Sequence, residues 1–196
     1  MILASRSPQR RAILEQLEIP FEVRIADVEE LGQGPPHEVV AENAYRKAAA
    51  VAGGGTAVYE AGGEGGEAGG ELVLGVDTIV SLAGRIYGKP GDVEDARATL
   101  RALSGHRHAV MSGVCLIDGG RVRTAVSMTL VQFRALDEAL LEWYLATGEW
   151  ASRAGSYAIQ GRGAALVERI EGDYLNVVGL PVATLLELAP EVLGVP

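Results

Sequence analysis

An apolar run with a carboxylate inside it, Leu-Val-Leu-Gly-Val-Asp-Thr-Ile-Val at residues 72–80, constrains the fold of this chain more than any other stretch. Its Val, Leu and Ile content predicts a buried strand. Asp77 lies within the run, and an ionised carboxylate is costly to bury unless a cation, a metal ion or several donors compensate it. We therefore expect a positive group to face Asp77, or Asp77 to lie at the open end of a cleft. A strand-end Asp that caps a turn is the alternative.

The chain turns back on itself after this run. Ala83-Gly84-Arg85 has the composition of a hairpin turn, and Gly88-Lys89-Pro90 follows the returning segment. A hairpin would bring Lys89 back near the level of Asp77. Lys89 is therefore the first candidate for the missing positive partner.

A second cationic candidate lies near the start of the chain. Residues 2–5 read as a short strand, Ser7 is a good helix N-cap, and Pro8 suits the first helical position. A strand that leads into a helix N-terminus presents free N–H groups and the positive end of the helix dipole. With Arg10 and Arg11 in the first turn, this predicts a phosphate site. A solvated basic turn is the alternative.

Two further charged groups follow the predicted strand at 21–25. Acidic residues at 27–30, including Glu30, could bind a divalent metal ion through oxygen ligands, although such residues are more often a solvated loop. A helix is expected at 38–51, with Lys47 near its end. Lys47 either complements the helix dipole or reaches into a cleft.

Net charge and cysteine content restrict the possible partners and compartment. The chain has 196 residues, a formal net charge of −9 and one cysteine, Cys115. Non-specific binding to DNA or membranes depends on positive charge, so neither nucleic acid nor a membrane is expected as a partner. One cysteine allows no disulfide within the chain, and no apolar run suits a signal peptide or a membrane span. We expect a cytoplasmic protein in which Cys115 is a small buried hydrophobic residue.

The remaining pattern predicts the fold class. The expected strands are at 106–117, 121–133 and 164–170, and the expected helices are at 92–103, 137–146 and 182–188. Irregular alternation of strands and helices, with hairpins, favours an α/β fold with a mixed sheet. The length suits a single domain spanning residues 1–196, with the Gly-rich segment 53–70 as a flexible insertion.

Two smaller features have open interpretations. His106 and His108 alternate on the predicted strand at 106–117, so they would share a face, and a two-His metal site is one interpretation. The glycines that bracket Tyr157 and Gln160 indicate a tight loop, which a backbone or a ligand approaches closely.

Seven spaced motifs, taken together, resemble the Maf family of nucleoside triphosphate pyrophosphatases. The motifs are Ser7-Pro8-x-Arg10, Lys47-Ala48, Gly75-x-Asp77-Thr78, Gly88-Lys89-Pro90, Leu103-Ser104-Gly105, Ala154-Gly155-x-Tyr157-x-Ile159-Gln160-Gly161, and Gly172-Asp173-Tyr174 followed by Val178-Gly179-Leu180-Pro181. The resemblance runs from residue 2 to about residue 188 and is interrupted only by the Gly-rich insertion.

The resemblance implies a fold, a reaction and a cofactor. The fold is a mixed, twisted α/β sheet with flanking helices, arranged as two lobes around a central cleft and related to the inosine triphosphate pyrophosphatases. The reaction cleaves a nucleoside triphosphate between its α- and β-phosphates, with a divalent cation, Mg²⁺ or Mn²⁺, as a house-cleaning activity. A homodimer is also implied.

The resemblance further implies roles for individual residues. Asp77 matches the family's proposed general base, with Lys89 and Lys47 beside it, and Glu30 and Asp77 match the metal-binding acids. The expected substrate-binding residues are Ser7, Gln9, Arg10, Thr78, Arg153 and Gln160.

Gln160 and Thr78 match the branch that acts on dTTP and UTP. The Gln160 amide offers one donor and one acceptor, which can pair with N3–H and a carbonyl of uracil or thymine. Gln9 and Arg153 depart from the common pattern, in which Arg and Lys are usual. The same cleavage of 7-methyl-GTP or a modified pyrimidine nucleotide is one alternative, and a nucleotide-binding regulator of septum formation is another.

Overall fold

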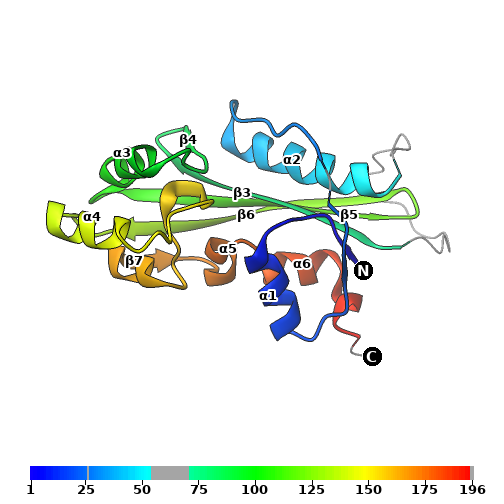
Figure 1. The fold of residues 1–196 in the computed structure, drawn as a ribbon. Coiled ribbons are helices and arrows are strands. Elements are labelled where there is room, and N and C mark those ends of the chain that lie inside the picture. Colours follow the sequence, from blue (N-terminus) through cyan, green and yellow to red (C-terminus); the bar gives the residue numbers. More distant parts are fainter. Residues whose placement is uncertain (26, 54–70, 195–196) are drawn as a thin grey trace.

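The fold is a mixed sheet with helices on both faces. The computed structural model describes residues 1–25, 27–53 and 71–194. Within them, a seven-stranded sheet has the order β2-β1-β3-β5-β6-β7, with β4 paired to β3 (Figure 1). Its strands are β1 (Ile2–Leu3), β2 (Glu22–Val23), β3 (Val73–Leu82), β4 (Arg85–Tyr87), β5 (Arg107–Asp118), β6 (Arg121–Phe133) and β7 (Val167–Glu171). Residues 54–70 of the predicted Gly-rich insertion lie outside the described residues, so its expected flexibility stays a prediction.

Strand directions confirm the predicted mixed sheet. β1 is parallel to both β2 and β3, whereas the β3–β5, β5–β6 and β6–β7 pairs are antiparallel. The expected hairpin is present, because β4 pairs antiparallel with β3 from Val80 opposite Tyr87 to Leu82 opposite Arg85. The strand predicted at 164–170 begins later than expected, because residues 162–166 form a 3-10 turn that precedes β7.

Six α-helices flank the sheet in the described residues. They are α1 (Pro8–Gln16), α2 (Pro36–Val51), α3 (Val93–Leu103), α4 (Glu138–Leu145), α5 (Tyr174–Val178) and α6 (Val182–Leu188). Short polar side chains start several of them: Ser7 accepts from the Arg10 amide, as the sequence predicted, and Asp92 and Asp137 cap α3 and α4. None of the helices described has the length and apolar character needed to cross a bilayer.

Helix α2 packs on one face of the sheet, and α1 and α6 pack on the other (Figure 1). The helix α2 side buries Ala44 and Ala48 against Cys115, which is fully buried as predicted. Burial raises the pKa of the Cys115 thiol to about 12, so it is protonated at neutral pH. A separate apolar cluster joins α3 and α4 to the far end of the sheet.

Candidate active site

The candidate site lies where strand β3 loses its neighbour on one side. β1 pairs with β3 only at Val73 and Leu74, and β4 pairs with it only from Val80 onward. Between these pairings, β3 is bonded to β5 alone among the described strands. Asp77 and Thr78 lie in this gap, and their side chains point to opposite faces because strand residues alternate.

Two glycines allow helix α2 to approach the sheet closely above Asp77. A Cβ atom at Gly75 would overlap the carbonyl oxygen of Ala44, and one at Gly113 would overlap that of Val40. Glycine is therefore required at both positions by the contact with helix backbone. This close contact brings two polar α2 side chains within reach of Asp77.

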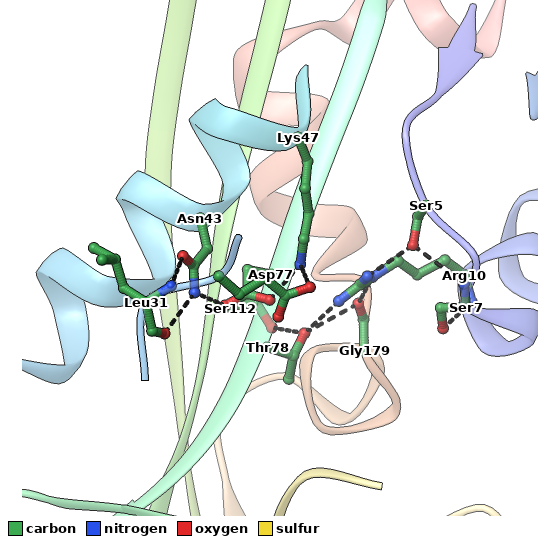
Figure 2. A network of polar contacts seen from close by, with 11 residues as sticks. Ser5, Ser7, Arg10, Leu31, Asn43, Lys47, Asp77, Thr78, Ser112 and Gly179 are labelled. Carbon is green, nitrogen blue, oxygen red and sulfur yellow. Dashed lines mark hydrogen bonds and ion pairs between the residues drawn. The ribbon is translucent and has the colours of Figure 1, made fainter. Parts of the chain in front are cut away.

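These side chains are Lys47 and Asn43, which are 8% and 1% exposed (Figure 2). Lys47 Nζ lies 2.6 Å from Asp77 Oδ1, and Asn43 Nδ2 donates to Asp77 Oδ2 at 3.0 Å. The same Lys47 ammonium lies 2.9 Å from Glu30 Oε1. The alternative for Lys47, a residue that only complements the helix dipole, is wrong, whereas Glu30 is exposed, as expected of a solvated loop, and still pairs with Lys47.

These contacts keep the Asp77 carboxylate ionised. Burial acts to raise the pKa of Asp77. The charge of Lys47, the hydrogen bonds from Lys47 and Asn43 and the charge of Arg10 outweigh burial and hold that pKa below its ordinary value. Asp77 is 5% exposed, so this is the buried, compensated carboxylate that the sequence predicted.

On the other face of β3, Arg10 makes a second network (Figure 2). Its Nη2 donates to Thr78 Oγ1 at 3.0 Å, its Nη1 to Ser5 Oγ at 2.9 Å, and its Nε to the Gly179 carbonyl at 2.8 Å. Thr78 Oγ1 is also 2.9 Å from Ser112 Oγ. Burial lowers the pKa of Arg10 from its ordinary value, although Asp77 and Glu30 act in the opposite direction.

Arg10 is therefore not a solvated basic side chain, since it is 8% exposed. Its neighbour Arg11 is exposed, and Arg11 Nη2 lies 3.9 Å from Glu15 Oε1. Ser7 caps α1 by accepting from the Arg10 amide at 3.4 Å, and its hydroxyl donates to Gln9 Oε1 at 3.1 Å. The predicted substrate-binding residues Ser7, Gln9 and Arg10 thus lie together at the start of α1.

Lys89 is not the partner that Asp77 was expected to have. The hairpin forms, but Lys89 is exposed and has no hydrogen-bond or ion-pair partner among the described residues, whereas Lys47 contacts Asp77 directly. Lys89 instead lines a cavity of about 320 Å³ between β4 and α3, together with Tyr87 and Thr99. Sequence proximity was misleading because the residue that faces Asp77 comes from the helix above the strand.

The segment with Arg153 and Gln160 is fixed by buried contacts, although both side chains are without a hydrogen-bond partner in the described structure. The Gly155 amide donates to the Gly88 carbonyl at 3.2 Å, which places this segment beside the Lys89 turn. The Ala158 amide donates to Tyr144 Oη at 3.0 Å. Gly155 has φ +69°, and a Cβ there would press on the Val80 side chain. A Cβ at Gly163 would overlap the backbone of Ala158, which confirms the predicted close approach of a backbone.

His108 holds the same segment and forms no metal site with His106. His108 Nε2 lies 3.0 Å from Tyr157 Oη, and burial lowers the pKa of His108 to about 4. His106 lies before β5, is exposed and places Nδ1 2.7 Å from the Ser104 carbonyl. The two-His interpretation is therefore wrong, because one ring is buried against Tyr157 and the other faces solvent.

Some residues of the site were missed from the sequence. Asn43 could have been found, because it lies four residues before Lys47 on one helix and so shares its face. Ser5 and Ser112 reach the site through the fold and have no local signal, and Gly179, which belongs to the seventh motif, contributes its carbonyl. Among the described residues, no cluster of at least three His, Cys, Asp or Glu side chains is placed to hold a metal ion.

Comparison with known proteins finds relatives over nearly the full length of the chain. The chain is 44% identical over 192 residues to the dTTP/UTP pyrophosphatase of Pelotomaculum thermopropionicum, which covers 96% of this chain and 94% of that protein. It is 40% identical over 189 residues to the dTTP/UTP pyrophosphatase of Pyrococcus furiosus, and the match covers 96% of this chain and 93% of that protein. It is 43% identical over 187 residues to the dTTP/UTP pyrophosphatase of Bacillus cytotoxicus, and the match covers 94% of this chain and 91% of that protein.

A family model described as Maf-like protein matches residues 1–192, which include every element that contributes to the Asp77 and Arg10 networks. With this match and these relatives, the chain belongs to the Maf family.

Proposed function

We propose that this protein hydrolyses dTTP and UTP between the α- and β-phosphates and releases the nucleoside monophosphate and pyrophosphate. The relatives named above as dTTP/UTP pyrophosphatases support this substrate class. The observation that carries the proposal is the buried, ionised Asp77, compensated by Lys47 and Asn43 at the open edge of β3. Buried carboxylates whose pKa is shifted by a specific charged partner cluster at functional sites.

In the proposed reaction, Asp77 is the general base. It accepts a proton from the attacking water while the water oxygen bonds to the α-phosphorus and the anhydride oxygen leaves with pyrophosphate. The negative charge that spreads over the phosphoryl oxygens requires nearby cations. Lys47, already beside Asp77, and Lys89, exposed and without a partner in the described structure, supply them.

Glu30 and Asp77 are the residues that would hold the divalent cation. The two carboxylates fit such an ion, because both contact one ammonium group, that of Lys47, and Mg²⁺ is typically bound by one or two carboxylates together with substrate phosphates. When bound, Mg²⁺ or Mn²⁺ would neutralise phosphate charge and favour ionisation of water.

Gln160 is the proposed base-reading residue. Its side chain is exposed and its amide carries a donor and an acceptor, which match N3–H and a carbonyl of uracil or thymine. Arg153 is proposed to contact phosphate. Arg10 is proposed to act by its charge and by fixing Thr78, because its guanidinium already donates to Thr78, Ser5 and Gly179.

The proposal extends to the shape of the molecule, its oligomeric state and its role in the cell. We propose a two-lobed arrangement with a cleft between the lobes, a homodimer, and a house-cleaning role in the cytoplasm. A modified pyrimidine nucleotide would fit the same base-reading amide.

The decisive experiment is the release of pyrophosphate from a panel of nucleotides in Mg²⁺ or Mn²⁺. We expect turnover of dTTP and UTP to exceed that of 7-methyl-GTP and the purine triphosphates. A preference for 7-methyl-GTP would contradict the base reading by Gln160 but leave the reaction intact. No pyrophosphate from any triphosphate would contradict the reaction and favour a nucleotide-binding regulator.

A further inference from the structure

The Asn43 side chain connects two parts of the proposed site that are far apart in the sequence. Asn43 Nδ2 donates to Asp77 Oδ2 and to the Leu31 carbonyl, both at 3.0 Å, and Asn43 Oδ1 accepts from the Leu31 amide at 2.7 Å (Figure 2). Leu31 directly follows Glu30. One buried amide therefore bonds the Asp77 carboxylate and the backbone beside the Glu30 carboxylate.

The orientation of this amide follows from its partners. The Leu31 N–H can only donate, so it must face the amide oxygen, and the Asp77 carboxylate can only accept, so it must face the amide nitrogen. The opposite orientation would place an oxygen against the carboxylate and an NH₂ group against an N–H. The three contacts thus specify a single arrangement.

The segment with Glu30 depends on this amide for its backbone contacts. Residues 27–35 contain no helix or strand, so Leu31 has no ladder partner, and Asn43 satisfies both its N–H and its C=O. Helix α2 contributes two more contacts to the segment from the same face: Arg46 Nη1 donates to the Glu29 carbonyl at 3.2 Å, and Lys47 pairs with Glu30.

Asn43 and Lys47 bind different oxygens of Asp77. Lys47 Nζ donates to Asp77 Oδ1, whereas Asn43 Nδ2 donates to Asp77 Oδ2. The Asn43 bond can therefore persist when Lys47 and Oδ1 change partners as phosphate enters. The neutral amide also orients the carboxylate without competing with a cation for charge.

We infer that Asn43 is a positioning residue, which fixes Glu30 relative to Asp77 and so prepares the two carboxylates for the divalent cation. This inference rests on the proposed function. Residues that orient metal-binding groups through hydrogen bonds typically contribute about 10- to 100-fold in metal affinity or activity.

The test compares Asn43→Leu and Asn43→Asp with Arg46→Met. Asn43→Leu removes all contacts of the amide, whereas Asn43→Asp keeps the shape and the acceptor for the Leu31 amide but removes the donor to Asp77. Arg46→Met is the matched control, because it removes a contact to the same segment without touching Asp77.

For both Asn43 variants, we expect kcat on dTTP to fall about 10- to 100-fold and the half-saturating Mg²⁺ concentration to rise by a similar factor, with KM for dTTP changed by less than about threefold. Hydrogen exchange gives a readout independent of activity. Exchange of the Leu31 amide should accelerate in Asn43→Leu, while Asn43→Asp and Arg46→Met should retain slower exchange.

Wild-type kcat and Mg²⁺ dependence in a folded Asn43 variant would overturn the inference, as would an equal loss in Arg46→Met. If Asn43→Leu does not fold, the kcat and Mg²⁺ dependence of Asn43→Asp test the inference. A wild-type protein that releases no pyrophosphate would instead contradict the proposed function, and this inference with it, so the two failures are distinguishable.

Discussion

The polar residues of the proposed site fall into two regions with opposite character. Around Asp77, every polar side chain has a partner: Lys47 and Asn43 bond the carboxylate, and Lys47 also contacts Glu30. The second region, defined by Lys89, Arg153 and Gln160, has no side-chain hydrogen bond or ion pair in the described structure. Its backbone, in contrast, is fixed by the Gly155–Gly88 hydrogen bond and by buried aromatic residues.

This difference distinguishes side chains that are already held in place by hydrogen bonds and ion pairs from side chains whose hydrogen-bonding groups are available to a ligand. Preorganised charges reduce the cost of reorganisation in the transition state, and the Asp77 network has that property. Unpartnered cations and an unpartnered amide on a fixed backbone instead offer their hydrogen bonds to an incoming anion or base. Changes in the first region should therefore affect kcat and stability, and changes in the second should affect substrate binding with the fold intact.

The largest expected effect is that of Asp77→Asn, which keeps the shape of the side chain but removes the proton acceptor. We expect kcat on dTTP and UTP to fall by about 10²- to 10⁴-fold, the usual contribution of a positioned general base. Steady-state pyrophosphate release measures it. Asp27→Asn is the control, because the Asp27 side chain is fully exposed. Turnover near wild type in Asp77→Asn would refute the assignment of the base.

Lys47→Met and Lys89→Met compare the two regions directly. Removing Lys47 leaves a buried carboxylate with its main cation gone, which typically costs about 3–5 kcal/mol in unfolding free energy. Lys89→Met should change the unfolding free energy by less than about 0.5 kcal/mol, because Lys89 is exposed, while lowering kcat/KM for dTTP. Urea unfolding and kcat/KM for dTTP measure the two effects.

The pH dependence of this pair has a definite sign. The pKa of Asp77 is lowered in the folded protein, so its stabilising contribution is complete above the unfolded pKa, about 3.9, and is lost as pH falls through the lower folded value. The stability difference between wild type and Lys47→Met should therefore shrink in acid. A difference that is constant down to the acid transition would contradict the ion pair as its source.

Much of the fold was predictable because its signals are local. The caps Ser7, Asp92 and Asp137 define helix starts by their own hydrogen bonds, and the turn at Ala83-Gly84-Arg85 defines the β3–β4 hairpin. The burial of Asp77 followed from the apolar run around it. Its need for a cation followed from the cost of burying charge.

The identity of that cation was not predictable from local signals. Lys89 was favoured because it is near Asp77 along the chain, but the contact to Lys47 depends on how closely α2 packs on the sheet. That distance is set by Gly75 and Gly113, whose missing side chains admit the helix backbone. Likewise, His106 and His108 differ because β5 begins only at Arg107, a boundary that the alternation pattern does not define.

A smaller effect is expected at His108, which anchors the second region through Tyr157. Its pKa is lowered to about 4 in the folded protein against about 6.5 unfolded, so protonation favours unfolding and stability decreases as pH falls through this interval. Between pH 7 and pH 5 the loss should be about 2 kcal/mol. His108→Gln can still bond the tyrosine but does not titrate, and its stability should depend less on pH in urea unfolding. An identical pH slope in both proteins would exclude His108 as the titrating group.

The smallest effect is expected for Gln160→Ala, which tests the difference between the Asp77 network and the second region. The exposed Gln160 amide has no partner in the described structure, so its removal should leave the unfolding free energy within about 0.5 kcal/mol of wild type. Loss of base contacts worth about 1.4 kcal/mol should lower kcat/KM for dTTP and UTP about tenfold. Turnover of 7-methyl-GTP should change much less, because its larger purine ring places the N1–H and C6 carbonyl at a different position relative to the sugar. An equal loss on all nucleotides would mean that Gln160 acts on phosphate or on the loop rather than on the base. A large loss of stability would mean that this residue belongs with the Asp77 network, and the division into a prepared and an open region would fail at that point.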